Sequence, residues 1–492
     1  MGGIEMKRFA WLWLFGLLTL FLVACSDKAE EEGSKPETTK DGKTVLTIAY
    51  KDDGPSSEAS VKYYDALEEA LKKYRDLDVE FNIVEIAQGD YAEKLNLLLY
   101  SGEIPDIIYF QGSDEQIAAQ GLLEDLTPYI EGSEYLKDIL YEHNVTRLEN
   151  YPYLLWVKPI NHKVPVVRTD FLEQLTTSES LLADPTVENY KAFFQEMVDK
   201  GLSEYGVTVA GDIAELDFIF NRAFGVTSTW LEGKEGYVYK KVSEAEKSKL
   251  AFYAELYAEG LLDNQYLTKQ WDVKEDDFYN NKAGVIVGTN GKVIDLYNTR
   301  TKAVNGESAE LTVLPSAKGV SSGYAATSVT KEPRGIAISS QSPNKNIAFE
   351  ILDFLASPEG MKFELLGYEG EHYILHNGEI ELTDKFYSEW VSRFWEPQDV
   401  KFDTPLSSET PLLSPPGQAS TNAIVESYVA DNDFSIPEEY ISQWDAMENL
   451  YKEYAADIIT GKISIDEFEQ FVDEWYAAGG EEITKLANET VK

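Results

Sequence analysis

The chain has 492 residues, of which 43% are apolar and 26% are charged, and its 87 acidic against 43 basic side chains give a formal net charge of -44. This composition is typical of a soluble globular protein, and the length predicts two to four domains. So much negative charge repels phosphate backbones and anionic lipid headgroups, which argues against nucleic acid and against a polybasic membrane contact as partners.

An export signal is predicted at the start of the chain. Lys7 and Arg8 precede an apolar run over residues 11–23, which as a helix of about 20 Å is too short for a hydrocarbon core of about 30 Å. The run ends in Leu22-Val23-Ala24-Cys25, which resembles the bacterial lipobox, where the signal is cleaved before a cysteine that is then lipidated. Because Cys25 is the only cysteine, it has no internal disulfide partner. We therefore expect residues 1–24 to be a lipoprotein signal peptide and Cys25 to carry the lipid (palmitate).

A flexible tether is predicted next, over residues 25–43, because this stretch is acidic and almost free of apolar residues. The globular body begins at residue 44, where the residues become β-branched and alternate in polarity. The periodicity of the body predicts these elements in chain order: strand 44–50, helix 56–74, strand 79–86, helix 90–100, a turn and strand over 102–110, strand 164–168, helix 187–200, strand 205–210, helix 243–260, strand 284–288, strand 334–339 and helix 344–356.

The alternation of strands and helices indicates a parallel sheet covered on both faces, and its return after residue 160 indicates two such lobes. Residues beyond about 385 are predicted to be mainly helical. Ligands of open α/β sheets sit outside the carboxyl ends of the strands, so two facing lobes predict a cleft between them.

A set of short motifs resembles the lipid-anchored, family 1 extracellular solute-binding proteins of bacterial ABC importers, the group that includes maltose-binding proteins. The fragments occur in the family's order: Gly102-Glu103-Ile104-Pro105-Asp106-Ile107-Ile108, Val167-Arg168-Thr169-Asp170-Phe171-Leu172, Thr186-Val187-Glu188-Asn189-Tyr190, Tyr257-Ala258-Glu259-Gly260-Leu261-Leu262-Asp263, Asn280-Asn281-Lys282-Ala283-Gly284, Ser357-Pro358-Glu359-Gly360 and Gly367-Tyr368-Glu369-Gly370-Glu371-His372-Tyr373. Together they cover roughly residues 44–490. The segment 151–156 matches only loosely the G-x-x-Y-[GA]-[IL]-P motif that precedes the first hinge in the family.

The resemblance implies an α/β fold of the class II periplasmic-binding type, with hinge strands and a mainly helical C-terminal part. It places residues 44–160 plus 334–380 in an N-lobe and residues 161–333 plus 381–492 in a C-lobe. It also implies a monomer, held by its lipid on the outer face of a bacterial, Gram-positive-type membrane. Its partners would be a small-molecule carbohydrate and the transmembrane subunits of an ABC permease.

Metal, cofactor and catalytic motifs are weak in this sequence. His372 and His376 have the spacing of metal ligands on a helix, but Asn377-Gly378 predicts a β-hairpin, where positions four apart lie about 13 Å from each other. Residues 460–468 resemble the second half of an EF-hand loop, but Ala456 occupies its first ligand position. A Walker A motif and a dinucleotide fingerprint are absent. We expect neither an enzyme nor a bound metal or cofactor.

Carbohydrate binding requires rigid aromatic side chains beside polar ones, and two tryptophans have the expected setting. Trp230 and Trp271 lie between small or polar residues and outside an apolar period. Other candidate ligand contacts lie where strands end or begin, and they are Asp52, Asp53, Phe110, Gln111, Asp114, Tyr324 and Arg334. Of these, Phe110, Gln111 and Asp114 are favoured by the family resemblance.

Two other functions stay open at this point. A peptide or another small solute would need a more polar cleft than a sugar, and an extracellular glycan-degrading enzyme would need a pair of carboxylates in the cleft. An anionic sugar would require Arg334, Lys158 or Arg168 to point inward, since the chain as a whole is acidic.

Overall fold

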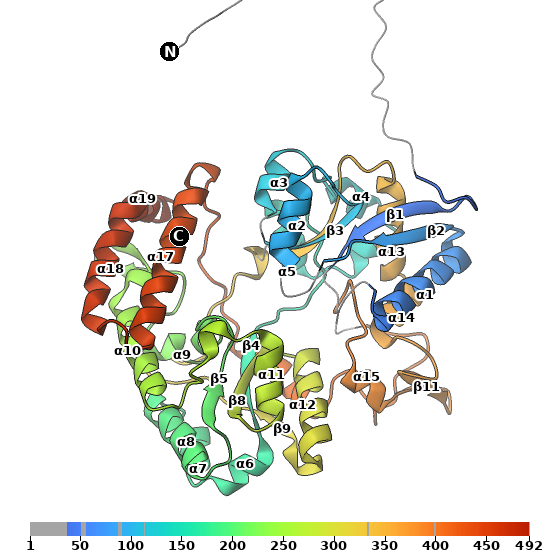
Figure 1. The fold of residues 1–492 in the computed structure, drawn as a ribbon. Coiled ribbons are helices and arrows are strands. Elements are labelled where there is room, and N and C mark those ends of the chain that lie inside the picture. Colours follow the sequence, from blue (N-terminus) through green and yellow to red (C-terminus); the bar gives the residue numbers. More distant parts are fainter. Residues whose placement is uncertain are drawn as a thin grey trace, which may run out of the picture.

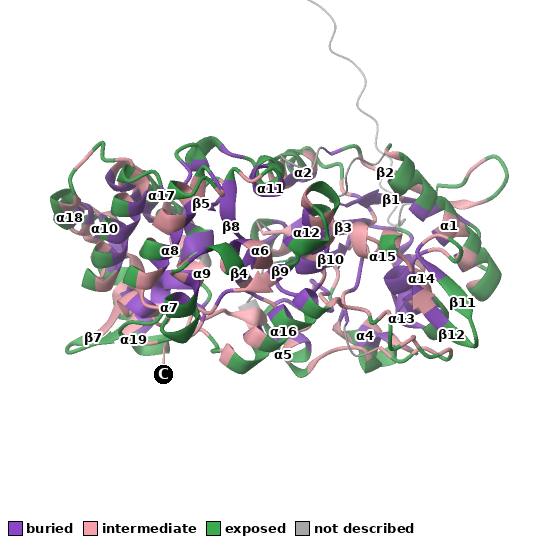
Figure 2. Ribbon diagram, turned by 90° about the horizontal axis from the view of Figure 1, so that it is seen from below, coloured by how far each residue is buried: buried purple, intermediate pink, exposed green. Residues whose placement is uncertain are grey.

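A computed structural model gives the fold of the chain. It describes residues 37–50, 56–86, 91–112, 114–331, 334–397 and 400–491. The predicted signal peptide and Cys25 therefore lie outside the described residues, as do Asp52 and Asp53. The body has two lobes, each built on its own four-stranded sheet (Figure 1). Buried residues gather along the strands of both lobes, and the outward faces of the helices are exposed (Figure 2).

The N-lobe sheet has the strand order β10-β3-β1-β2, in which β1 is parallel to β2 and β3, and β10 is antiparallel to β3. Helices cover the sheet, as expected for strands that are apolar on both faces. Its elements are β1 (Thr44–Ala49), α1 (Glu58–Arg75), β2 (Val79–Ile83), α2 (Tyr91–Tyr100), β3 (Ile107–Gln111), α3 (Glu115–Ala119), α4 (Thr127–Gly132), α5 (Glu142–Asn150), β10 (Arg334–Ile338), α13 (Lys345–Ala356) and α14 (Pro358–Leu366).

The C-lobe sheet has the order β5-β8-β4-β9, with β5 parallel to β8 and β4 antiparallel to both of its neighbours. The sheet is thus mixed rather than fully parallel. The elements of the C-lobe as a whole are β4 (Lys163–Arg168), α6 (Thr169–Gln174), α7 (Ser178–Ala183), α8 (Val187–Asp199), β5 (Tyr205–Thr208), α9 (Ala214–Phe224), β6 (Trp230–Gly233), β7 (Gly236–Tyr239), α10 (Glu244–Ala258), α11 (Trp271–Tyr279), β8 (Ala283–Thr289), α12 (Lys292–Asn305), β9 (Leu311–Val313) and α16 (Pro415–Ser427).

The predicted C-terminal helices are present and belong to the C-lobe. They are α17 (Ile441–Ile459), α18 (Phe468–Trp475) and α19 (Glu481–Thr490), and their apolar side chains join the larger C-lobe core. Within the described ranges, no helix combines the length and apolar character needed to cross a membrane.

The predicted hairpin is formed by β11 (Tyr373–His376) and β12 (Glu379–Leu382). Its turn needs two residues with positive φ, and Asn377 and Gly378 have φ of 51° and 84°. The hairpin and the short helix α15 (Asp384–Ser388) form a small core with the end of α14. Helix α15 also packs against α12, so this appendage of the N-lobe reaches the C-lobe.

Three connections join the lobes. Each runs from a buried core residue of one lobe to the next buried core residue of the other. The first runs between Val157 and Val164, the second between Tyr324 and Ile336, and the third between Trp395 and Ile424. The third begins later than residue 380, because Phe394 and Trp395 are buried in the N-lobe core.

Candidate functional site

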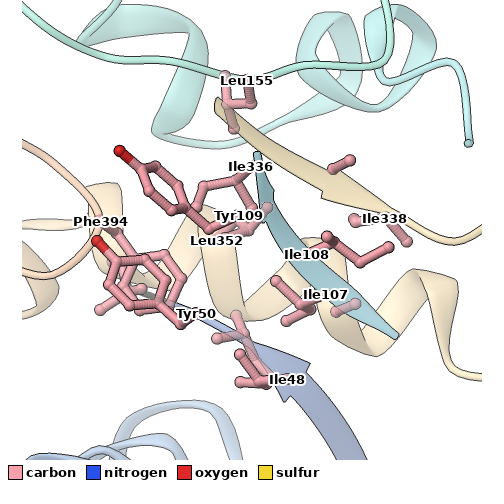
Figure 3. Close-up of a cluster of buried hydrophobic side chains, with 14 of the residues drawn as sticks. Ile48, Tyr50, Ile107, Ile108, Tyr109, Leu155, Ile336, Ile338, Leu352 and Phe394 are labelled. Carbon is pink, nitrogen blue, oxygen red and sulfur yellow. The ribbon is translucent and has the colours of Figure 1, made fainter. Parts of the chain in front are cut away.

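The N-lobe strands end beside a small aromatic cavity of about 190 Å³. Tyr50 follows β1 and Tyr109 lies in β3, with their ring centroids 4.9 Å apart. Trp156, from the first interlobe connection, adds a third ring 5.8 Å from Tyr109. In Figure 3 the hydroxyls of Tyr50 and Tyr109 point to the same side, away from the isoleucines of the sheet. The cavity lies where an open α/β sheet is expected to bind its ligand.

A second cavity, of about 750 Å³, adjoins the first and is lined by both lobes. Trp390 and Lys158 line both cavities, so the two are adjacent. The C-lobe contributes Asn290 and Lys292, directly after the carboxyl end of β8, and α16 contributes Thr421. We call these two joined cavities the interlobe cleft.

Trp390 has a central place in the interlobe cleft. It lines both joined cavities and also a third one, of about 380 Å³, beside α1 and α14. Its side chain is partly buried, so the ring keeps an accessible face. A flat, partly exposed indole is the kind of surface on which a sugar ring stacks.

The segment after Trp390 is held in place by a buried carboxylate, that of Glu364 at 0% exposure. Its Oε1 accepts hydrogen bonds from the backbone N–H groups of Arg393, Phe394 and Trp395, and its Oε2 accepts one from the Tyr63 hydroxyl at 2.6 Å. Burial raises the pKa of Glu364 to about 7, although these hydrogen bonds act to lower it. The Tyr50 hydroxyl also donates to the carbonyl of Arg393.

Charged side chains of the interlobe cleft are mostly cationic. Lys158 pairs with Glu396, its Nζ lying 3.0 Å from the carboxylate. Arg393 lines the smaller cavity and lies over the Tyr63 ring at 5.4 Å. His143 contacts the Lys158 carbonyl at 2.7 Å through Nε2, and burial lowers its pKa below the usual value, so it is neutral near pH 7.

Of the site residues predicted from sequence, Gln111 and Arg334 are favourably placed. Gln111 lines the smaller cavity, and the exposed Arg334 is its direct partner across the β3–β10 pair. Arg334 lines neither joined cavity. Arg168 is buried and bound to Asp170, whereas Lys158 does point into the cleft.

Phe110 and Trp230 lie in hydrophobic cores, at 0% and 1% exposure. Phe110 belongs to the N-lobe core, and Trp230 packs against Tyr239 and Phe434 in the C-lobe. Neither ring has an open face for a sugar, which corrects the sequence-based expectation for both residues. The apolar side chains that surround these two rings in the fold determine where the rings lie, and the polar residues next to them in the sequence do not.

Asp114, Tyr324 and Trp271 also lie away from the interlobe cleft. Asp114 is fully buried and accepts a hydrogen bond from the Tyr153 hydroxyl at 2.9 Å, and burial raises its pKa to about 6. Tyr324 is 5% exposed and donates to the Leu314 carbonyl at 2.8 Å. Trp271 is 41% exposed at the start of α11. These three expected ligand contacts therefore do not line the cleft.

Seven aromatic residues that line the cleft were not predicted: Tyr50, Tyr109, Tyr141, Trp156, Phe386, Trp390 and Phe394. For Trp390 the signal is weak, because Phe386, Val391 and Phe394 recur around it at helical spacing and favour a core side chain. For Tyr109 the signal is absent, since all four residues 107–110 are buried and alternation in β3 does not tell which side chain faces the ligand.

The histidines of the hairpin segment make separate contacts. His372 Nε2 lies 3.1 Å from a carboxylate oxygen of Glu389, and His376 Nδ1 lies 3.1 Å from one of Glu381. In the part of the chain that the structure describes, no three His, Cys, Asp or Glu side chains are grouped so as to hold a metal ion.

Two lobes joined by three connections, with an aromatic and polar cleft between them, define a ligand-binding receptor of the two-lobe class. The family described as bacterial extracellular solute-binding protein matches residues 62–368. The chain belongs to this family.

Curated relatives cover almost the whole chain. Lipoprotein LipO of Bacillus subtilis (strain 168) is 21% identical over 508 residues, which cover 96% of both chains. The polygalacturonan/rhamnogalacturonan-binding protein YtcQ of the same organism is 21% identical over 503 residues, which cover 95% of this chain and 94% of YtcQ.

Solved structures share the fold. An alginate-binding protein, AlgQ2, crystallised without calcium, has a TM-score of 0.67 at 15% identity, with 91% of this chain and 97% of that chain covered. The N-glycan transport solute-binding protein NgtS of Streptococcus pneumoniae has a TM-score of 0.63 at 15% identity, with 91% and 98% covered. The predicted two-lobe α/β fold is thereby confirmed.

Proposed function

We propose that this protein captures an oligosaccharide in the interlobe cleft and delivers it to an ABC permease. The observation that carries the proposal is the row of partly accessible aromatic side chains, with Trp390 and Trp156 beside polar groups from both lobes. Aromatic faces stack on the apolar faces of sugar rings, and the polar groups bind the hydroxyls. Relatives named for polygalacturonan, alginate and N-glycans support a saccharide ligand.

Capture would work by closure of the lobes around the three connections. A ligand that contacts both lobes binds the closed form better and shifts the population toward it. The cleft has the required two-sided lining, with Trp390 on the N-lobe and Asn290 on the C-lobe. The closed form is then the one that the permease recognises.

The proposed receptor is a monomer that stays at the outer face of the membrane through a lipid on Cys25. Two observations support this placement: the lipobox-like Leu22-Val23-Ala24-Cys25 in the sequence, and the similarity to a protein named as a lipoprotein. The predicted tether over residues 25–43 is shorter than expected, because residues 37–43 turn back on β1 and the Val45 N–H donates to the Glu37 carbonyl at 3.0 Å. The part before residue 37 would let the body reach the permease.

Binding without turnover is part of the proposal. A glycosidase needs two carboxylates on either side of the scissile bond, whereas Glu396 is the one carboxylate among the described residues that line the cleft, and it is paired with Lys158. A peptide ligand fits this row of aromatic side chains less well than a sugar, because peptides offer few flat apolar faces for stacking.

A thermal-shift screen of residues 26–492 tests the proposal. The ligands are neutral and acidic oligosaccharides and short peptides, and each mixture is also assayed for new reducing ends. At a hundred times its dissociation constant, a bound ligand adds about 2.7 kcal/mol of stability. A raised midpoint with one glycan class and no new reducing ends supports the receptor. A shift only with peptides, or release of reducing ends, would refute it.

A further inference from the structure

The interlobe cleft has the opposite charge to the rest of the protein. In a chain with a formal net charge of -44, the described residues that line the cleft include three cations, Lys158, Lys292 and Arg393, and one carboxylate, Glu396. Lys158 and Glu396 neutralise each other at 3.0 Å. Lys292 therefore lines the cleft as a cation without an ion-pair partner among the described residues, which a neutral sugar does not need.

Lys292 is the cation best placed to act on a ligand. It begins α12, directly after the loop that leaves β8, and it lines the larger cavity. Its Nζ donates to the carbonyl of Phe386 in α15 and lies 4.1 Å from the centroid of that residue's ring. Lys292 thus sits at the contact between the two lobes, since α15 belongs to the N-lobe appendage.

No described carboxylate forms an ion pair with Lys292 within 4.0 Å. The nearest acid that influences it is Asp295, one turn along α12. Asp295 is directed to a different partner: its Oδ1 accepts hydrogen bonds from the backbone N–H of Ser414 at 3.1 Å and from the Ser414 hydroxyl. Its Oδ2 is buried without a hydrogen-bond partner among the described residues, so Asp295 acts on the Lys292 ammonium through space and not as a direct ion pair.

An ammonium has three N–H donors, and within the described residues the Phe386 carbonyl accepts one of them. Removing a charged group from water without pairing it is unfavourable. This burial lowers the pKa of Lys292 to about 8, so the side chain is still mainly charged at pH 7. The remaining donors suit a carboxylate, which forms shorter and stronger hydrogen bonds with an ammonium than a neutral hydroxyl does.

We infer that the interlobe cleft selects an acidic saccharide, one that carries carboxylates on its rings, and that Lys292 binds one of these carboxylates. The inference rests on the proposed saccharide-binding function and adds its charge class. The bound carboxylate would also lie at the contact between the lobes. Lys292 belongs to the C-lobe, and its Nζ donates to the Phe386 carbonyl of the N-lobe.

The test uses pairs of ligands that differ only in charge. Tri-galacturonate and tri-mannuronate are each paired with their carboxyl-reduced counterparts, which keep the linkage but have neutral CH₂OH groups. Affinities of residues 26–492 are measured by isothermal titration for the wild type, K292Q and K292R. The matched control is K302Q, a lysine on the same helix that pairs with Glu307 at 2.6 Å and lies outside the cleft.

We expect the wild type and K302Q to bind at least one acidic trimer ten times or more as tightly as its reduced counterpart. K292Q should lose that preference, because it weakens binding of the acidic trimer by more than it weakens binding of the reduced one, and K292R should retain part of the preference. Equal loss of both ligands in K292Q, with an unchanged thermal midpoint, would show that Lys292 does not read charge.

Failure of the inference and failure of the proposed function give different results. Wild-type binding of the reduced trimers, or of other neutral glycans, as tightly as the acidic ones would overturn the acidic class and leave the saccharide receptor intact. Binding of no saccharide of either kind would overturn both.

Discussion

Glu364 controls how the site segment responds to pH, and its replacement by glutamine is a direct test. The buried carboxylate holds the backbone N–H groups of residues 393–395 and the Tyr63 hydroxyl. Glutamine has the same shape. Its carbonyl oxygen can accept from the backbone, and its amide can donate to the Tyr63 oxygen, but it does not titrate.

The pKa of Glu364 is about 7 in the folded protein and 4.5 in the reference state. Between these two values the folded chain holds a proton that the unfolded chain has lost, so the free energy of unfolding of the wild type falls as pH rises through this window. At about 1.4 kcal/mol per pKa unit, the full difference is about 3 kcal/mol. In E364Q this contribution is absent.

Urea unfolding of both proteins at a series of pH values between about 4.5 and 8 measures the effect. The quantity of interest is the free energy of unfolding of E364Q minus that of the wild type, because other titrating groups cancel in it. It should rise by about 3 kcal/mol from the acidic to the alkaline end. A difference that is constant within about 0.5 kcal/mol, or that falls as pH rises, would refute the reasoning.

Three further predictions follow from other buried groups. Burial lowers the pKa of His162 to about 4, so as pH falls the unfolded chain takes up the proton before the folded chain does. The free energy of unfolding of the wild type therefore falls between pH 6.5 and 4, and in H162Q this fall should be smaller by about 3 kcal/mol, as measured by urea unfolding. Lys249 is 1% exposed and pairs with Asp217 at 2.7 Å and with Glu246 at 2.9 Å. K249M should lower the free energy of unfolding by about 3–5 kcal/mol in a urea titration, because buried carboxylates lose their cation, and a change under about 1 kcal/mol would contradict this. Affinity for an acidic ligand should fall above about pH 8 as Lys292 loses its proton, and titrations of K292Q, which keeps the nearby Asp295 and Tyr387, should lack that fall.

Much of the fold could be predicted because local patterns agree with the final contacts. The helix over residues 56–74 and the strand over residues 44–50 match α1 and β1 to within two residues at each end. The Asn377-Gly378 turn sets the register of the hairpin, in which His376 faces Glu379. Such features depend on residues that are close together in the sequence, so they can be predicted from it.

The site was harder to predict because it depends on contacts between distant segments. Trp390 enters the cleft only because Glu364, Tyr63 and Tyr50 hold the segment that follows it. The polar neighbours of Trp230 have a structural role instead, as the Thr229 hydroxyl donates to Asp431 at 2.6 Å and the Ser228 hydroxyl donates to the Trp230 carbonyl at 2.9 Å. A polar setting around a tryptophan thus has two causes that sequence alone does not separate.

Tyr109 and Phe110 show the same limit in a strand. Both are apolar neighbours in β3, and both are almost fully buried. Tyr109 contacts Tyr50 and Trp156 at the cavity, whereas Phe110 lies in the core. Which of the two side chains faces the cavity is decided by how the whole lobe packs around β3. That packing includes β10, which follows more than two hundred residues later in the chain.

The most direct test of the account compares two tryptophans in one binding assay. Trp390 lines the interlobe cleft, and Trp271 is exposed outside it. With the glycan identified by the thermal-shift screen, W390A should bind at least tenfold more weakly than the wild type, a loss of about 1.4 kcal/mol or more, while W271A should bind within about twofold of the wild type. Loss of binding in W271A with full affinity in W390A would contradict the placement of the site in the interlobe cleft.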